Sequence, residues 1–408
     1  MRYSSESHHK APTIISRFVP TLVLSETVPK AEDIMRIGVP TEIKSNEFRV
    51  GLVPSSVREL AARGHDVVVQ SGAGAGIFAD DADYEKAGAR ILPTADAVFA
   101  DSEMIVKVKE PQAVEYRRLK PHQILFTYLH LAPDPEQARG LMASGATAIA
   151  YETVTDANGG LPLLAPMSEV AGRLAIEAAA IALRRPTGGR GVLMGGVPGV
   201  RPAKVVVLGG GVVGTHAARM AVGLGAEVTI IDRSLPRLRQ LDELFHGRVR
   251  TLASTMDSVE TEVLGADVVI GAVLVAGASA PKLVTRDMLP RMKRGAVLVD
   301  VSIDQGGCFE TSRATTHADP TFEVDGIIHY CVANMPGAVP VTSAQALNNA
   351  TLPFVIKLAH KGVAAFDDDP HLAAGLNVRD GRITHKAVAA SLGFDGAPTE
   401  KVRLVAAE

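Results

Sequence analysis

The chain has 408 residues, which at roughly 150 residues per domain predicts two or three domains. Hydrophobic residues make up 47% and charged residues 21%, so we expect a folded protein rather than a disordered one. The formal net charge of -3 argues against a general nucleic-acid or membrane-surface binder. Cys308 and Cys331 can build neither a disulfide framework nor a C-x-x-C zinc site, so we expect no metal and a reducing cytoplasm.

Residues 1–34 differ from the rest of the chain. They hold four basic and four acidic residues, whereas a mitochondrial transit peptide is Arg-rich and poor in acids. Their apolar stretches are interrupted by Pro20 and Glu26, which argues against a secretory signal. We therefore expect a disordered leader, or a start upstream of the true one at Met35. No apolar run reaches the 18 or so residues of a membrane span, so no membrane partner is expected.

Short apolar runs alternate with helical patterns from Met35 to about Tyr151. This alternation predicts βαβ units and a mainly parallel sheet. The predicted strands are Val67–Val69, Met104–Val106, Ile124–Phe126 and Ala148–Ala150, and the predicted helices are Ser55–Arg63 and Pro133–Ser144. A longer Ala-rich helix is predicted over Ser168–Arg185, ended by Pro186 and the glycines after it.

A second alternating series follows the glycine-rich segment Gly188–Pro202, which we expect to be a loop. Its apolar runs show no polar alternation, as expected for strands covered by helices on both faces. The predicted strands are Val205–Leu208, Val228–Ile231, Val268–Ile270 and Val297–Val299. After Pro340 the pattern is helical again over Thr342–His360, where Pro353 is expected to introduce a kink.

These patterns predict an α/β fold of two doubly wound, Rossmann-like domains, each with a mainly parallel sheet, and a cleft between them. The helical tail has no sheet of its own, so we expect it to return to the first domain. The predicted division is a leader at 1–34, a first domain at 35–162 and 341–408, and a second domain at 163–340. Ligands are expected in the cleft, beyond the carboxyl ends of the strands.

A G-x-G-x-x-G pattern at Gly209, Gly211 and Gly214 follows one predicted strand and opens a helical run. In a dinucleotide-binding turn the first glycine makes the tight turn, the second admits the pyrophosphate and the third lets the helix pack on its strand. Asp232 ends the next predicted strand, where a carboxylate accepts hydrogen bonds from the ribose hydroxyls and repels a 2′-phosphate. The pattern therefore indicates NAD rather than NADP.

Ionisable residues interrupt the apolar sequence of the first domain at Arg49, Lys107, Lys109 and His130. Taken singly, Arg49 is explained as a surface loop charge and the two lysines as a solvated edge, whereas for His130 a functional role is favoured over that of a core histidine. Taken together, cationic and protonatable groups at strand ends suit a small anionic substrate.

Two carboxylates follow a strand of the second domain. Asp304 is the candidate for the active site, and Asp300 is the competing carboxylate, with a capping or pairing role as its alternative.

From Met35 onward the chain closely resembles bacterial L-alanine dehydrogenases, in the alanine dehydrogenase and transhydrogenase N-terminal family. The matching motifs are Met35–Glu42, Asn46–Val50, Lys107–Glu110, Leu125–Leu131, Leu161–Leu174, Gly188–Val200, Val301–Glu310 and Tyr330–Pro336. The resemblance implies reversible, NAD-dependent oxidative deamination of L-alanine to pyruvate and ammonium, by hydride transfer from the α carbon, in a homohexamer.

The resemblance also implies roles for individual residues. Arg49 and Lys109 are similar to the family's substrate-binding residues, His130 to its acid/base, and Asp304 to its essential carboxylate. The cofactor-binding residues implied in this way are Ser168, Gly209, Gly211, Gly214, Asp232, Arg237, Ser254, Val273, Leu274, Val301, Asp304, Val332 and Asn334. Arg237 stands where the family sometimes has lysine, and the middle residue of Gly209–Gly211 is glycine where alanine is frequent.

Three alternatives stay open. One is the NAD-binding subunit of a proton-translocating transhydrogenase, which shares the fold but needs membrane and NADP partners. Another is an opine- or lysine-type dehydrogenase with a larger pocket, and the last is a catalytically silent NAD-binding or sensor protein. The breadth of substrates also stays open, because alanine and glycine differ by one methyl group, which a hydrophobic pocket discriminates only modestly.

Overall fold

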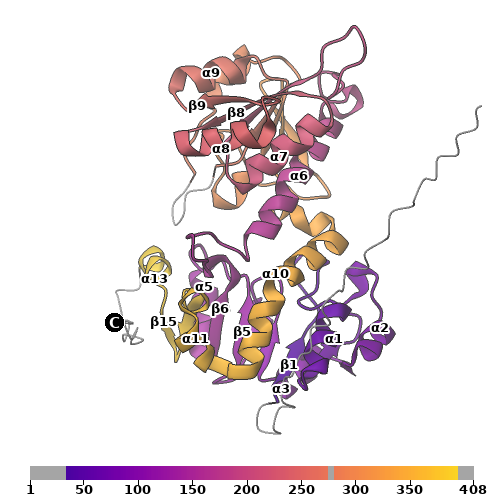
Figure 1. Cartoon of the computed structure of the whole chain (residues 1–408), viewed down its shortest axis with the longest axis vertical. Coiled ribbons are helices and arrows are strands. Elements are labelled where there is room, and N and C mark those ends of the chain that lie inside the picture. Colours follow the sequence, from indigo (N-terminus) through magenta and orange to yellow (C-terminus); the bar gives the residue numbers. More distant parts are fainter. Residues whose placement is uncertain (1–33, 274–279, 394–408) are drawn as a thin grey trace, which may run out of the picture.

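The structure of the chain is a computed structural model that describes residues 34–273 and 280–393 (Figure 1). Most of the predicted leader and the predicted cofactor contact Leu274 lie outside the described residues. The described part contains two mainly parallel sheets, each in a domain of its own, which confirms the predicted fold class.

The sheet of the first domain is built around six parallel strands. They are β1 (Arg36–Val39), β2 (Asp66–Gln70), β3 (Arg90–Leu92), β4 (Met104–Val106), β5 (Ile124–Thr127) and β6 (Thr147–Ala150). Two antiparallel strands, β14 (Leu376–Arg379) and β15 (Arg382–Ile383), extend it beside β6. The order β15-β14-β6-β5-β4-β1-β2-β3 reverses direction between β1 and β4, which makes that pair the switch point of the sheet.

The sheet of the second domain has the order β12-β13-β11-β10-β7-β8-β9. Its strands are β7 (Lys204–Leu208), β8 (Glu227–Asp232), β9 (Arg250–Ala253), β10 (Val268–Gly271), β11 (Val297–Asp300), β12 (Thr321–Val324) and β13 (Ile327–Tyr330). Here the order reverses between β7 and β10, which therefore form the second switch point. The central strands are apolar along their whole length because both faces are covered, and Val205 and Val268 are fully buried.

Helices cover both sheets. In the first domain they are α1 (Pro54–Ala62), η2 (Ala75–Ile77), α2 (Asp81–Ala87), α3 (Ala95–Asp101), α4 (Ala113–Tyr116), α5 (Pro135–Ser144) and η3 (Tyr151–Thr153). In the second they are α7 (Val212–Gly223), α8 (Leu235–Phe245), α9 (Met256–Leu264), η5 (Arg286–Arg291) and η6 (Val301–Gln305). Their ends follow local sequence rules: the Asp80 side chain caps α2, and Gly145 ends α5 in the left-handed conformation.

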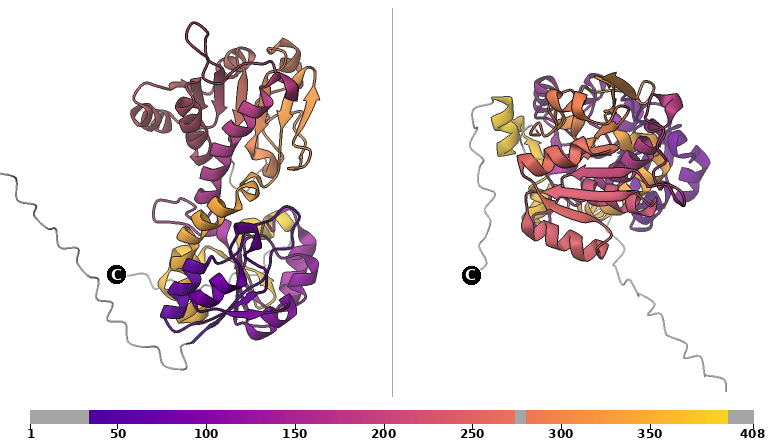
Figure 2. Two further views of the ribbon diagram at one scale, coloured as in Figure 1. Left: turned by 90° about the vertical axis from the view of Figure 1, so that its right-hand side faces the viewer. Right: turned by 90° about the horizontal axis from the view of Figure 1, so that it is seen from above.

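Two long helices, α6 (Ala165–Ala182) and α10 (Pro340–Lys361), run between the domains and contact each other (Figures 1 and 2). Pro353 lies inside α10, which continues through it; the kink predicted there stays a prediction. The remaining helices are η4 (Arg185–Thr187), η7 (Met335–Ala338), η8 (Gly362–Ala364), α11 (Ala365–Asp368), α12 (Pro370–Ala373) and α13 (Lys386–Leu392). We expected the segment after α10 to be purely helical. It also contains β14 and β15, which add to the sheet of the first domain.

Close packing of α6 on α7 holds the second domain to the connecting helix, and it depends on Gly172. A Cβ added to Gly172 would lie 2.2 Å from the Val213 carbonyl oxygen. That oxygen belongs to the helix backbone, so the helices would have to separate to accommodate a methyl group.

We predict that Gly172→Ala lowers the free energy of unfolding by about 1–3 kcal/mol, because overpacking outweighs the better helix propensity of alanine. The matched control is Gly223→Ala in α7, where an added Cβ meets nothing within 4 Å. The control should be neutral or stabilising by up to about 1 kcal/mol. Thermal and urea unfolding measure both, and equal midpoints for the two variants would contradict this account of the α6–α7 contact.

Candidate active site

Ionisable side chains of the first domain gather at the carboxyl edge of its sheet. Arg49 lies in the loop after β1, Lys109 follows β4 and His130 follows β5. Since β1 and β4 form the switch point, Arg49 and Lys109 flank the position where ligands bind in open α/β sheets.

The Arg49 guanidinium is buried, with 2% of the residue exposed, so it is not the surface loop charge considered above. Its Nε donates to Glu47 Oε1 at 2.6 Å, and a second nitrogen donates to Asn334 Oδ1 at 2.9 Å. Asn334 Nδ2 in turn donates to Glu47 Oε2 at 3.0 Å. Burial alone would raise the pKa of the Glu47 carboxyl, but the hydrogen bonds from Arg49 lower it below its ordinary value. Arg49 and Glu47 therefore form a charged ion pair, and Asn334 connects this pair to the second domain.

Lys109 is also buried, so it is not part of a solvated edge. Burial lowers the pKa of its ammonium, the neighbouring Arg49 lowers it further, and the carboxylates of Glu110 and Asp304 oppose the shift. Within residues 34–273 and 280–393 its Nζ makes no hydrogen bond or ion pair. An ammonium in this setting is available to a ligand oxygen.

Lys107 is fully buried and has a different task. Its Nζ donates to Glu115 Oε1 at 2.7 Å and to Glu42 Oε2 at 3.1 Å. Glu42 also accepts the backbone N–H of Val108 at 2.7 Å. This buried triad fixes the backbone just before Lys109, so Lys107 is a structural residue rather than a ligand-binding one.

His130 has an exposed side chain and a left-handed backbone, with φ 47°, so it is not a core histidine. The Glu152 carboxylate accepts its backbone N–H at 2.6 Å and that of Leu129 at 3.1 Å. The imidazole lies 6.1 Å from the Tyr128 ring, centroid to centroid, with the planes 19° apart. A non-glycine residue with positive φ is uncommon and needs such support, which Glu152 supplies from η3, directly after β6.

Asp304 and Asp300 differ in exposure. Asp300, at the end of β11, is fully buried, and its carboxylate accepts backbone N–H groups. Asp304 lies in η6, is exposed, and is close enough to Lys109 to influence its pKa. Of the two carboxylates, Asp304 is the one that a ligand can reach.

The glycine-rich turn of the second domain has the features of a dinucleotide cradle. Gly209 has φ 99°, and a Cβ there would lie 2.5 Å from the Ala272 carbonyl oxygen. A Cβ on Gly214 would lie 1.8 Å from the Gly209 oxygen, so only glycine lets α7 approach the turn. At Gly211, which precedes α7, an added Cβ meets nothing within 4 Å. The turn is thus open beside the helix N-terminus, where phosphates bind.

Asp232 and Arg237 lie beside this turn. The Asp232 carboxylate accepts the backbone N–H groups of Gly210 and Ser234, at 2.7 and 2.8 Å. Each oxygen keeps a second lone pair for a ligand hydroxyl. Arg237 Nε donates to the Gly210 carbonyl oxygen at 2.7 Å, so this guanidinium braces the turn.

The other residues assigned to the cofactor follow strands of the second sheet, with one exception. Ser254 follows β9, Val273 follows β10, Val301 follows β11, and Val332 and Asn334 follow β13. Val332 is 1% exposed and contributes to the core. The exception, Ser168, lies in the first turns of α6, directly after Met167, whose sulfur accepts a hydrogen bond from Arg49.

Sequence reasoning missed the carboxylates that hold the cationic and protonatable groups. Glu47 stands two residues before Arg49, a spacing that was a usable signal. Glu42 and Glu152 are far in sequence from the segments they hold, and no local pattern indicates the pairing.

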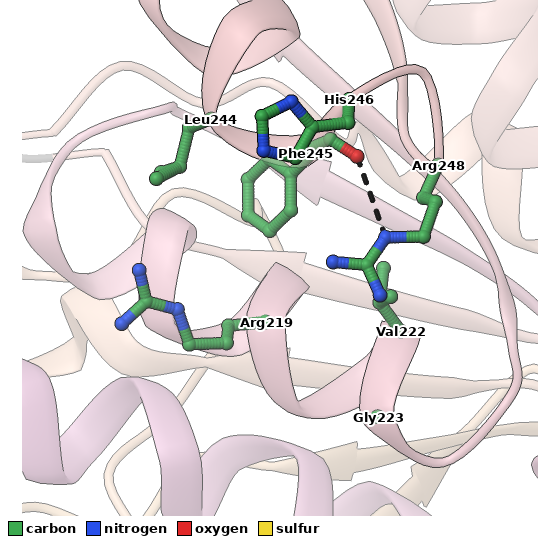
Figure 3. Close-up of a pocket in the computed structure, with 7 residues that line it drawn as sticks. All are labelled: Arg219, Val222, Gly223, Leu244, Phe245, His246 and Arg248. Atoms are coloured by element: carbon green, nitrogen blue, oxygen red, sulfur yellow. Dashed lines mark hydrogen bonds between the residues drawn. The ribbon is translucent and has the colours of Figure 1, made fainter. Parts of the chain in front are cut away.

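A hollow of about 320 Å³ lies elsewhere on the second domain (Figure 3). Its lining residues are Arg219, Val222, Gly223, Leu244, Phe245, His246 and Arg248. They belong to the C-terminal halves of α7 and α8 and the turn that follows α8, the far end of α7 from Gly211. The hollow is therefore separate from the candidate active site.

The fold and the site together define a two-domain, Rossmann-like protein that has buried cations at the carboxyl edge of one sheet and a glycine-rich turn, open beside a helix N-terminus, in the other domain. The family models of the alanine dehydrogenase/PNT N-terminal domain and C-terminal domain match residues 38–171 and 175–386. The chain belongs to the alanine dehydrogenase/PNT family.

Individual relatives agree with this assignment. The chain is 61% identical to the alanine dehydrogenase of Halomonas elongata, over 88% of this chain and 98% of that protein. A solved L-alanine dehydrogenase structure matches with a TM-score of 0.85 at 55% identity, covering 88% of this chain and 99% of that one. A transhydrogenase structure from Sinorhizobium meliloti matches with a TM-score of 0.74 at 28% identity, covering 86% and 99%. In the described residues no helix has the length and hydropathy to cross a membrane.

We predict that Lys107→Met destabilises the fold by about 3–5 kcal/mol, because it leaves the buried carboxylates of Glu42 and Glu115 without a cation. The control is Lys361→Met, which breaks an ion pair with Asp368 whose side chains are 51% and 58% exposed. That loss should be within about 1 kcal/mol. Denaturant unfolding of both variants measures the difference, and a Lys107 variant as stable as the control would refute the structural role.

Proposed function

We propose that the chain catalyses the reversible, NAD-dependent oxidative deamination of L-alanine to pyruvate and ammonium. The observation that carries the proposal is the buried Arg49 beside Lys109, at the switch point of a chain 61% identical to an alanine dehydrogenase. Two adjacent buried cations match the carboxylate and keto oxygen of a small 2-oxo acid.

Arg49 binds the substrate carboxylate in this proposal. Glu47 already occupies one edge of the guanidinium, through Nε and one terminal nitrogen. Within the described residues, the hydrogen bonds from the other edge go to Asn334 Oδ1 and Met167 Sδ, of which the thioether is a weak acceptor. A substrate carboxylate displaces these two acceptors and gains the bidentate pairing that guanidinium favours.

Lys109 and His130 act at the reacting carbon. The Lys109 ammonium binds the keto oxygen as a point charge. His130, exposed after the neighbouring strand β5, gives and takes the protons that water addition and ammonia release require. The Asp304 carboxylate balances the positive charge of the substrate iminium. NAD, held by Gly209, Gly211, Gly214 and Asp232, supplies the hydride acceptor when bound.

The cellular setting is part of the proposal. We infer a cytoplasmic homohexamer, in which each chain has a substrate domain formed by residues 35–162 and 341–408 and an NAD-binding domain formed by residues 163–340. The likeness to alanine dehydrogenases supports this inference. Sedimentation would test the assembly. The transhydrogenase alternative is less well supported, at 28% identity against 61%. A silent NAD-binding protein would bind NADH and consume none of it.

The direct test follows NADH consumption with pyruvate and ammonium, and with glyoxylate in place of pyruvate. We predict turnover with pyruvate that requires ammonium. A folded chain that binds NADH but consumes it with neither acid would refute the proposed function and favour the silent alternative.

We predict that His130→Ala lowers kcat by about 10²–10⁴-fold, because it removes the proton-transfer group. NADH affinity should stay within about twofold, and the change in NADH fluorescence on binding measures it. The matched control is His122→Ala, a histidine of the same domain that is also exposed and has φ 68°. A His130 variant with the kcat of the control would remove His130 from the mechanism.

We predict that Asp232→Ala weakens NADH binding and lowers the preference for NADH over NADPH by at least about tenfold, because the charge that repels a 2′-phosphate is lost. Asp242→Ala, on the exposed face of α8, is the control. The ratio of the two Kd values is decisive, since general loosening of the turn would weaken both cofactors alike. An unchanged ratio contradicts the assignment.

A further inference from the structure

Asp300 is a buried carboxylate that the mechanism above does not use. It is the last residue of β11 and is 0% exposed. In the part of the chain that the structure describes, no cation forms an ion pair with it. Burying a carboxylate without a nearby cation costs free energy, and the hydrogen bonds that it accepts offset this cost. The groups that donate those hydrogen bonds therefore show which part of the structure the carboxylate holds in place.

Among the described residues, the hydrogen-bond donors to Asp300 come from one segment, residues 301–312. Oδ1 accepts the backbone N–H of Ser302 at 3.1 Å, from the start of the segment, and the Cys308 thiol at 3.6 Å. Oδ2 accepts the N–H groups of Cys308 and Phe309 at 2.9 and 3.3 Å and the hydroxyl of Ser312, from its far end. The carboxylate therefore closes a loop, and Asp304 lies near the middle of that loop.

The shape of the loop depends on this closure. Gly306 and Gly307 both have positive φ, 84° and 73°, which turns the chain back toward Asp300. A Cβ on Gly307 would lie 2.5 Å from Asp300 Oδ2, so the backbone approaches as closely as glycine permits. Ser302 Oγ donates to the Val273 carbonyl oxygen at 2.8 Å, which ties the loop to the end of β10.

We propose that Asp300 is a positioning residue for the reaction: its carboxylate sets the place of Asp304 opposite Lys109 by holding both ends of the 301–312 loop. The expected effect of Asp300 on kcat rests on the proposed function, whereas the closure of the loop by Asp300 does not depend on it. Charge-assisted hydrogen bonds to backbone N–H groups are short and directional, which suits them to fix a loop.

The test is Asp300→Asn, because asparagine keeps the shape but points an N–H donor at groups that are themselves donors. Hydrogen exchange of the peptide covering 301–312 should rise at least about tenfold, and kcat should fall by about 10²-fold, as expected for a misplaced reacting group. The Kd for NADH should change much less than kcat.

The matched control is Asp267→Asn, at the amino-terminal end of β10. Asp267 is 6% exposed and accepts the Lys204 backbone N–H at 2.8 Å and Lys293 Nζ at 3.0 Å. This variant should lose thermal stability but keep kcat and the exchange rate of 301–312. A merely structural role for Asp300 predicts that both variants behave alike.

Ser312→Ala is the milder variant and keeps the inference testable if Asp300→Asn does not fold. It removes only the hydroxyl donor to Asp300, and we expect faster exchange in 301–312 with a kcat about three- to tenfold lower. Normal exchange of this peptide in a folded Asp300 or Ser312 variant would overturn the proposal, and so would normal kcat with faster exchange. Exchange requires no turnover, so an inactive wild-type chain would refute the proposed function while the role of Asp300 in loop closure is still decided.

Discussion

A buried guanidinium between two domains is the constraint on which the rest of the site depends. Arg49 has lost nearly all its hydration, and a charge in that position persists only where an opposite charge and hydrogen-bond acceptors replace the lost water. Glu47 from the same loop and Asn334 from the second domain supply them. Arg49 therefore contributes to the contact between the domains, and in the proposed function a substrate carboxylate at Arg49 would compete with Asn334 for the guanidinium.

Carboxylates play the same supporting part throughout the site. Glu42, Glu152 and Asp300 each accept backbone N–H groups just before or around a residue assigned to the chemistry. A carboxylate binds two or more N–H groups at once, so it fixes backbone that belongs to no regular element. The loops after the strands have no regular hydrogen-bond pattern of their own. These carboxylates fix the backbone of the loops, as the hydrogen bonds of a parallel sheet fix its strands.

The sequence predicted the strands β2, β4, β5, β6, β7, β8, β10 and β11, and it placed the candidate residues after strands, but it did not predict β1, which forms the first switch point with β4. Fully apolar runs such as Val205–Leu208 are distinctive, and polar residues after them mark the carboxyl edge of a sheet. The strands β14 and β15, at one side of the first sheet, were missed because they are short and pair antiparallel after a helical stretch. The partnership of Arg49 with Asn334 was also out of reach, since it joins residues far apart in the chain through tertiary packing alone.

The choice between Asp300 and Asp304 shows what exposure adds to sequence. Both carboxylates follow the same strand, and the sequence treats them as competitors. Burial separates them, because a carboxylate surrounded by N–H groups has its lone pairs engaged, whereas an exposed one near Lys109 can respond to a ligand. In the proposed arrangement the two carboxylates act together. Burying the Asp300 charge costs free energy, and in return Asp300 holds the loop that bears Asp304 in one conformation.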